Sequence, residues 1–309
     1  MLKKIDFKNE ESFNFAFDVV DSLGKNKPDK LAMLHISGDG TERRLTFRDM
    51  MKESARAANY FKSLGIKKGD KVMLVLKRHY QFWFAMIGLN KLGAIAIPAT
   101  NQLQEHDFEY RFKSAGVSAI VCTADGEVSN FVDIAQKSCP ELTIKMMVGG
   151  KKDGWRDFDS EYTLFSSHFK RVADSPCGDE IALMFFSSGT TGFPKAILHS
   201  HRALVCACYT ERAHHGQTKD DVFPCIPPPC FPSPLPSPQS FCPQRSRRYS
   251  CIYRPRGGRS WGYSYNTGHS CEEPPPEPSR LPSQTPPAFP PAPHPPETSP
   301  APVAEYRFP

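Results

Sequence analysis

Proline is distributed very unevenly along this 309-residue chain, and the distribution limits what the chain can fold into. Five of the 30 prolines precede residue 224, and the other 25 lie from Pro224 onward. The last lysine is Lys219, the last aspartate is Asp221, and the sequence after them shows no apolar periodicity. A segment without an apolar face cannot offset the conformational entropy that it loses on ordering. We therefore expect a folded part over residues 1–223 and a disordered, proline-rich, low-complexity tail over residues 224–309.

Helical and strand patterns alternate along residues 1–223, as is typical of an α/β fold. The patterns predict helices over residues 18–23, 81–92, 105–114, 128–137 and 201–212. They predict strands over residues 31–36, 43–47, 72–76, 94–97, 117–122, 142–148, 181–186 and 196–199. Residues 149–179 are polar, and we expect them to be irregular. The predicted fold is therefore α/β, with mixed sheets flanked by helices.

One further helix is predicted from its capping residues. Thr46 and Asp49 have the spacing of a capping box, in which the side chain of each residue binds the backbone N–H of the other. Gly65 suits the left-handed position that follows the end of such a helix. The apolar face predicted to be buried holds Phe47, Met51, Ala55, Ala58 and Phe61.

A Ser/Thr/Gly-rich segment, SSGTTGFPK, occupies residues 187–195 directly after an apolar run over residues 181–186. The run suits a buried strand, because it has no polar face. The segment offers hydroxyls, a lysine and two glycines that let a ligand approach the backbone, as a bound phosphate requires. An ordinary surface turn can share this composition, but the order of residues after a strand favours a phosphate-binding loop. The spacing is not of the Walker type, because no Gly-Lys-Ser/Thr follows the second glycine, and this argues against a P-loop kinase or GTPase.

Three segments, in order along the chain, resemble the adenylate-forming (AMP-binding) superfamily of acyl-CoA synthetases, luciferases and peptide-synthetase adenylation domains. The segment over residues 187–195 is the most specific of the three. Residues 65–72 (GIKKGDKV) are similar to the superfamily's Gly-x-x-x-Gly-Asp-x-Val turn, and residues 91–98 (KLGAIAIP) to its Lys-x-Gly-Ala-x-x-x-Pro segment. The resemblance covers residues 1 to about 223 and implies an incomplete N-terminal domain of the adenylate-forming fold.

The resemblance implies an ATP-dependent, AMP-forming acid–CoA ligase acting on a fatty-acid-like substrate. In such an enzyme a carboxylate attacks the α-phosphate of ATP, pyrophosphate leaves, and coenzyme A then displaces AMP from the acyl-adenylate. The implied cofactors are ATP, Mg²⁺ and coenzyme A. The residues implied to hold the β- and γ-phosphates are Ser187, Ser188, Gly189, Thr190, Thr191, Gly192, Pro194 and Lys195. An adenylating enzyme that does not use coenzyme A is the alternative within the superfamily.

The catalytic motifs that the superfamily carries further on are absent from this sequence, so we assign no catalytic residue. Residues 220–228 resemble the run that leads to an aromatic-His segment, but the sequence departs from that run at Pro229, and no Tyr-Gly-x-Thr-Glu motif follows. We therefore expect the chain to be catalytically defective, although it can retain phosphate binding. The change in composition at the same point suggests the hypothesis that the tail is an out-of-frame translation of a longer synthetase gene.

A non-catalytic interaction protein is the alternative from a different functional class. Residues 286–296 contain overlapping Pro-x-x-Pro spacings, which favour a polyproline II helix of the kind that SH3- and WW-type grooves bind. A solvated coil is the competing interpretation of the same residues.

No metal site is predicted, although histidines and cysteines gather after the phosphate-binding segment. They are His199, His201, Cys206, Cys208, His214 and His215. None of the standard zinc spacings occurs among them, and we expect the two cysteines to be buried thiols on a helix.

Charge, apolar runs and cysteine usage limit the expected partners and location. The net charge is +6, and no basic stripe is interleaved with aromatic residues, so we expect no nucleic-acid partner. Residues 1–10 lack the apolar core of a signal peptide, and the longest apolar stretch, residues 82–89, is too short to cross a bilayer. Ten cysteines without a secretory signal favour reduced thiols. We expect a cytoplasmic protein without a transmembrane segment.

Overall fold

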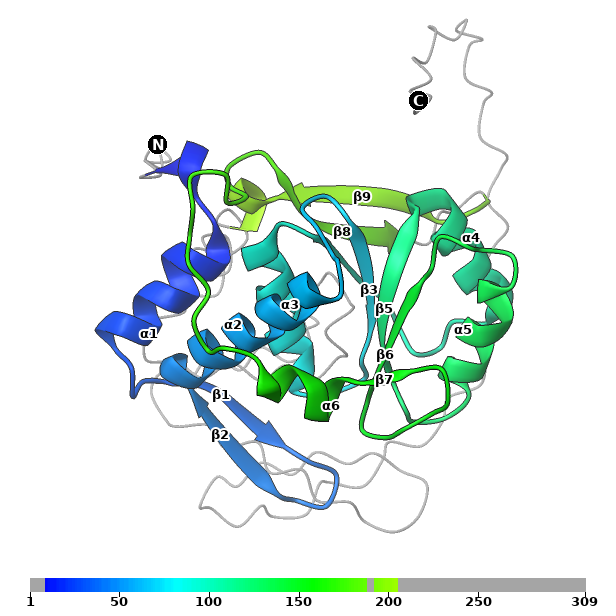
Figure 1. Ribbon diagram of the computed structural model, residues 1–309, viewed down its shortest axis with the longest axis horizontal. Coiled ribbons are helices and arrows are strands. Elements are labelled where there is room, and N and C mark those ends of the chain that lie inside the picture. Colours follow the sequence, from blue (N-terminus) through cyan, green and yellow to red (C-terminus); the bar gives the residue numbers. More distant parts are fainter. Residues whose placement is uncertain (1–8, 188–191, 205–309) are drawn as a thin grey trace, which may run out of the picture. The chain divides into compact units, whose positions relative to one another are not determined.

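The computed structural model describes residues 9–187 and 192–204 (Figure 1). The α-helices are α1 (Ser22–Asn26), α2 (Phe47–Ser63), α3 (Gln81–Leu92), α4 (Glu105–Ala115), α5 (Val128–Gln136) and α6 (Phe158–Glu161). A π-helix, Ala16–Asp21, leads into α1, and 3-10 helices span Glu10–Ser12 and Tyr162–Leu164. The strands are β1 (Leu31–Ile36), β2 (Glu42–Thr46), β3 (Lys71–Val75), β4 (Ile95–Pro98), β5 (Val117–Thr123), β6 (Ile144–Val148), β7 (Arg156–Asp157), β8 (Ile181–Ser187) and β9 (Lys195–Ser200).

A mixed sheet forms the centre of the described part, with seven strands there in the order β7-β6-β5-β3-β4-β8-β9. The pairs from β7 across to β8 are parallel, whereas β9 pairs antiparallel with β8. β1 and β2 form a separate antiparallel pair. The predicted α/β fold with mixed sheets and flanking helices is therefore confirmed for these residues.

Successive residues of β3 point to opposite faces of the sheet, and each face has its own apolar core. Val72 and Leu74 belong to the core that α2 and α3 cover, while Met73 and Val75 belong to the core that α4 and α5 cover. Figure 1 shows α2 and α3 on one side of the sheet and α4 and α5 on the other. Burial on both faces explains why the central strands are continuous apolar runs in the sequence.

The capping box predicted for α2 is present. The backbone N–H of Asp49 donates to Thr46 Oγ1 at 3.2 Å, and the backbone N–H of Thr46 donates to Asp49 Oδ2 at 2.8 Å. Gly65 follows the helix with φ of 87°, which is the left-handed conformation expected of it. The local sequence therefore determines both ends of α2.

α2 buries a wider face than its apolar pattern predicts. Ala55, Ala58 and Phe61 are buried as expected, whereas Phe47 and Met51 are only half-buried. The additional buried positions are Met50, Ser54, Ala57 and Tyr60. Ser54 and Ala57 lie at α3, and Tyr60 packs on α6, and the pattern of the helix itself cannot reveal these two neighbours.

The prediction that residues 149–179 are irregular is wrong for the first half of that segment. β7, α6 and the 3-10 helix Tyr162–Leu164 lie there, and Trp155, Phe158 and Tyr162 are buried. Each of these elements has two to four residues, which is too short for a periodic pattern. Burial of the three aromatic side chains, which pack under α2 and α5, holds the segment in place.

The helix predicted first is longer than expected, and two other predictions extend past the described residues. The helix predicted over residues 18–23 is a π-helix that continues into α1, so it runs on to Asn26. Of the helix predicted over residues 201–212, residues 201–204 are described, and they are helical. The tail over residues 224–309 and its boundary at residue 223 lie outside the described residues, so both stay predictions.

Candidate functional site

β8 and β9 carry the two ends of the segment predicted to bind phosphate. The strands pair antiparallel, with Ser187 opposite Lys195 and Phe186 opposite Ala196. The Ser187 hydroxyl donates to the Lys195 backbone carbonyl at 3.4 Å. The segment therefore begins and ends on two strands that are hydrogen-bonded to each other.

Half of the predicted phosphate-binding residues are described. Ser187 is the last residue of β8 and is half-buried, Lys195 is the first residue of β9 and is exposed, and Pro194 directly precedes it. Gly192 has φ of 110°, a conformation that other residues rarely adopt, so the glycine is needed at this turn. The predicted residues Ser188, Gly189, Thr190 and Thr191 lie outside the described residues.

Ser187 lies at the carboxyl edge of the parallel part of the sheet. β8 runs parallel to β4, β4 to β3, and β3 to β5, so the carboxyl ends of these strands share one edge. Ligands of open α/β sheets bind outside this edge. A hydroxyl and an exposed lysine at that position suit an anionic ligand.

Tyr110 of α4, which the sequence analysis did not select, contacts the same segment. Its hydroxyl donates to the Pro194 carbonyl at 2.9 Å, and its ring stacks on that of Phe193. The guanidinium of Arg111 lies 5.3 Å from the ring centroid of Phe186. No local pattern reveals these contacts, because Tyr110 and its hydrogen-bond partner are 84 positions apart.

A second polar cluster, also missed by the sequence analysis, lies at the carboxyl ends of β3 and β5. His79 Nε2 and Thr123 Oγ1 are 2.8 Å apart, and Lys77 pairs with Asp125 at 3.3 Å. Burial lowers the pKa of His79, while Asp125 and Asp159 act in the opposite direction. Since these groups pair with one another, we do not assign them to the phosphate site.

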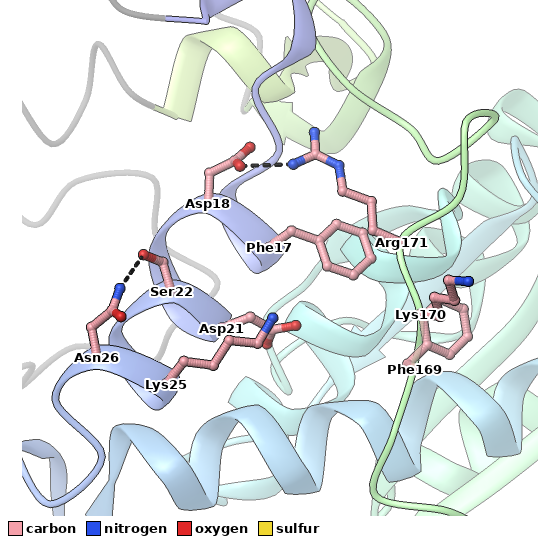
Figure 2. A pocket seen from close by; sticks show the side chains of 9 residues that line it. All are labelled: Phe17, Asp18, Asp21, Ser22, Lys25, Asn26, Phe169, Lys170 and Arg171. Atoms are coloured by element: carbon pink, nitrogen blue, oxygen red, sulfur yellow. Dashed lines mark hydrogen bonds and ion pairs between the residues drawn. The ribbon is translucent and has the colours of Figure 1, made fainter.

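Figure 2 shows a hollow in the surface between residues 169–171 and the helical segment formed by the π-helix and α1. Its lining side chains are Phe17, Asp18, Asp21, Ser22, Lys25, Asn26, Phe169, Lys170 and Arg171. The guanidinium of Arg171 donates to the Asp18 carboxylate at 2.7 Å and lies 5.5 Å from the ring centroid of Phe17. The lining carries charges of both signs, so it shows no preference for an anionic ligand.

Lys91 belongs to one of the segments that resemble the adenylate-forming superfamily, and its role in the structure is to hold elements together. It is 1% exposed, its Nζ lies 2.8 Å from Asp21 Oδ1, and it donates to the Met51 carbonyl at 3.1 Å. Burial lowers the pKa of Lys91, and the attraction of Asp21 acts against this. Lys91 therefore ties α3 to the π-helix and to α2.

Within residues 9–187 and 192–204, no group of three or more His, Cys, Asp or Glu side chains is placed to hold a metal ion. The His199 ring packs edge-on against Phe185, with centroids 5.6 Å apart, and His201 is fully buried. Cys206, Cys208, His214 and His215 lie outside the described residues. In the part of the chain that the structure describes, no helix has the length and apolar character needed to cross a membrane.

Comparison with known proteins matches the part of the chain that contains this site. A model of a family described as AMP-binding enzyme matches residues 20–234. The chain is 34% identical over 197 residues to acyl-coenzyme A synthetase ACSM5, mitochondrial, of Rattus norvegicus, which covers 62% of this chain and 33% of that protein. It is 34% identical over 218 residues to acyl-coenzyme A synthetase ACSM2A, mitochondrial, of Homo sapiens, which covers 68% of this chain and 37% of that protein.

Two solved structures share the fold. An anthranilate CoA ligase, AuaEII, in complex with anthranoyl-AMP matches with a TM-score of 0.54 and 25% identity, over 62% of this chain and 35% of that chain. An acyl-CoA synthetase of Brucella canis matches with a TM-score of 0.63 and 24% identity, over 74% of this chain and 40% of that chain. The chain spans about a third of the length of the curated relatives that it matches.

Proposed function

The chain belongs to the AMP-binding enzyme family, and on this basis we propose that it is part of an ATP-dependent, AMP-forming acid–CoA ligase. Relatives named acyl-coenzyme A synthetases, and a structural neighbour named an anthranilate CoA ligase, support the use of coenzyme A. They favour this proposal over an adenylating enzyme that does not use coenzyme A. Because the chain spans about a third of the length of those relatives, the proposed activity is that of the whole enzyme of which this chain forms part.

The proposed reaction activates a carboxylate in two steps. A carboxylate oxygen attacks the α-phosphate of ATP, and pyrophosphate leaves with the electrons of the broken P–O bond. The thiol of coenzyme A then displaces AMP and forms the thioester. In the first step the protein positions ATP and offsets the negative charge that collects on the departing pyrophosphate. We propose that this chain supplies the contacts to the β- and γ-phosphates.

The observation that carries the proposal is the pairing of Ser187 with Lys195 at the carboxyl edge of the sheet. The Lys195 ammonium supplies positive charge and the Gly192 N–H supplies a hydrogen-bond donor. The Ser187 hydroxyl donates to phosphate once it rotates away from the Lys195 carbonyl, to which it donates at 3.4 Å in this structure. Pro194, whose ring restricts φ, stiffens the exit of the loop. On the sequence alone, the proposal extends to Ser188, Gly189, Thr190 and Thr191. These donors suit phosphate oxygens and not a cation, so we propose that Mg²⁺ is carried by ATP and is not held by these residues.

The remaining parts of the proposal rest on sequence. The printed sequence contains no Tyr-Gly-x-Thr-Glu motif, so we propose that this chain binds ATP without completing the reaction. The substrate is proposed to be a fatty-acid-like carboxylic acid.

The out-of-frame origin of the tail and its contact with an SH3- or WW-type groove are proposals from composition. A cytoplasmic location is proposed as well, although the relatives above are named as mitochondrial, and cell fractionation decides between the two.

Isothermal titration calorimetry of the full chain with Mg·ATP tests the phosphate site. Lys195→Ala is expected to weaken ATP binding about tenfold, or ~1.4 kcal/mol, because it removes a charge-assisted contact. Lys137→Ala removes the same charge from an exposed position after α5 and is expected to leave the affinity unchanged. Equal ATP affinity in Lys195→Ala and the unaltered chain would contradict the assignment.

A further inference from the structure

Tyr110 contacts both residues that directly precede Lys195. Its hydroxyl donates to the Pro194 carbonyl at 2.9 Å. Its ring stacks on the Phe193 ring, with centroids 4.8 Å apart and an interplanar angle of 16°. We propose that Tyr110 positions Lys195 for phosphate binding, an inference that rests on the ATP site proposed above.

The hydrogen bond to Pro194 acts on the peptide unit that leads into Lys195. A peptide unit is planar, so the Pro194 carbonyl and the N–H and Cα of Lys195 move as one plate. The proline ring restricts φ of Pro194, and the pairing of Lys195 with Ser187 holds the far end of the plate. Rotation of the plate about the Pro194 Cα–C bond is the motion that remains, and the hydrogen bond from the Tyr110 hydroxyl limits it. The direction in which the Lys195 side chain leaves the backbone is thereby set.

The ring stack holds the turn before Pro194. Phe193 is 73% exposed, so it is not anchored by burial in the core. Gly192, the residue before it, has φ of 110° and gives the backbone a sharp change of direction. An offset stack of two rings is attractive beyond the area that it buries. The stack therefore fixes a turn whose aromatic side chain is otherwise in solvent.

α4 is a firm support for this tyrosine. Phe108 and Phe112 of the same helix are buried against the sheet. Arg111 lies over the ring of Phe186, the residue that precedes Ser187 in β8. Figure 1 shows the start of β9 beside α4. The helix thus contacts β8 and the two residues that lead into β9, and it links the position of Lys195 to the core.

Removal of the hydroxyl alone tests the proposal. Tyr110→Phe keeps the ring and deletes the bond to Pro194. Tyr60→Phe is the matched control, because its hydroxyl donates to Glu161 at 3.0 Å on the other face of the sheet. Two measurements on the full chain are compared: the dissociation constant for Mg·ATP by calorimetry, and amide hydrogen exchange over residues 193–200.

We expect Tyr110→Phe to weaken ATP binding about two- to tenfold, the range of one neutral hydrogen bond, and to speed exchange over residues 193–200. Tyr110→Leu, which also removes the stack, is expected to weaken binding further. Tyr60→Phe is expected to change neither measurement. Since the control deletes a tyrosine hydroxyl that donates to a partly buried carboxylate, a general loss of stability would affect ATP binding in both variants.

Two results would overturn the proposal, and they distinguish failure of the positioning role alone from failure of the ATP site. If the unaltered chain binds ATP and both Tyr110 variants bind it equally well, the positioning role is wrong while the ATP site stands. If the unaltered chain binds no ATP, the proposed function fails and the positioning role fails with it. Hydrogen exchange then still shows whether Tyr110 holds the hairpin.

Discussion

Replacing His201 by leucine is expected to reduce the loss of folding stability between pH 7.5 and pH 5 by about 2 kcal/mol. His201 is fully buried, and within the described ranges neither of its ring nitrogens has a hydrogen-bond partner. Burial lowers the pKa of His201 to about 4; Glu180 opposes this shift, and Arg171 and Lys68 reinforce it. The folded protein therefore resists protonation of this ring.

The size of the effect follows from the difference between the folded and unfolded pKa values. An unfolded histidine takes up a proton near pH 6.5, whereas the folded protein does so near pH 4. Between these values the unfolded state binds the additional proton, so the free energy of unfolding falls as the pH falls. The contribution is fully present above pH 6.5 and is lost on the way to pH 4. At about 1.4 kcal/mol per pH unit, the loss between pH 6.5 and pH 5 is about 2 kcal/mol.

Urea unfolding of the full chain, followed by circular dichroism at pH 7.5 and at pH 5, measures this loss. Other titrating groups affect the unaltered chain and His201→Leu alike, so the quantity to compare is the difference between their two losses. The unaltered chain is expected to lose about 2 kcal/mol more than the variant. Leucine has a similar volume and no polar atom to leave unpaired, so stability at pH 7.5 is expected to change little. Equal losses in the two proteins would refute the reasoning.

Two further predictions concern the buried ion pair and the tail. Asp21→Asn leaves the Lys91 charge buried without its partner, so we expect the free energy of unfolding, measured in urea, to fall by about 3 kcal/mol. The double variant Asp21→Asn/Lys91→Met also removes that charge, so it is expected to recover most of this loss. Unchanged stability in Asp21→Asn would show that the pair is not needed. Resequencing the coding DNA from codon 215 and translating all three frames is expected to reveal a Tyr-Gly-x-Thr-Glu motif after a one-base shift, and its absence from every frame would contradict an out-of-frame tail.

Elements whose ends are set by local chemistry could be predicted from the sequence. α3 has the predicted bounds, because its apolar run ends at Gly93, which adopts φ of 88°. α2 begins at the capping box that Thr46 and Asp49 form. β7 and α6 could not be predicted, because such short elements are held by the burial of Trp155 and Phe158 and not by a periodic pattern of their own.

The candidate site also has a part that the local sequence predicts and a part that it does not. The apolar run over residues 181–186 predicts a strand, the order of residues in SSGTTGFPK predicts a loop, and residues 196–199 are predicted as a second strand. The structure pairs Ser187 with Lys195 where that loop begins and ends. The support from Tyr110 could not be predicted, because it depends on how α4 packs against a hairpin that lies far away in the sequence. Contacts of that kind follow from the assembled sheet and not from any local segment.

Nuclear magnetic resonance of the full, ¹⁵N-labelled chain titrated with Mg·ATP tests the central claim most directly. The account predicts that the amide signals of Gly192, Phe193 and Lys195 shift, while those of Ser22 and Asn26 in the hollow of Figure 2 do not. Shifts confined to the hollow, or none at saturating ATP, would contradict the assignment of the phosphate site.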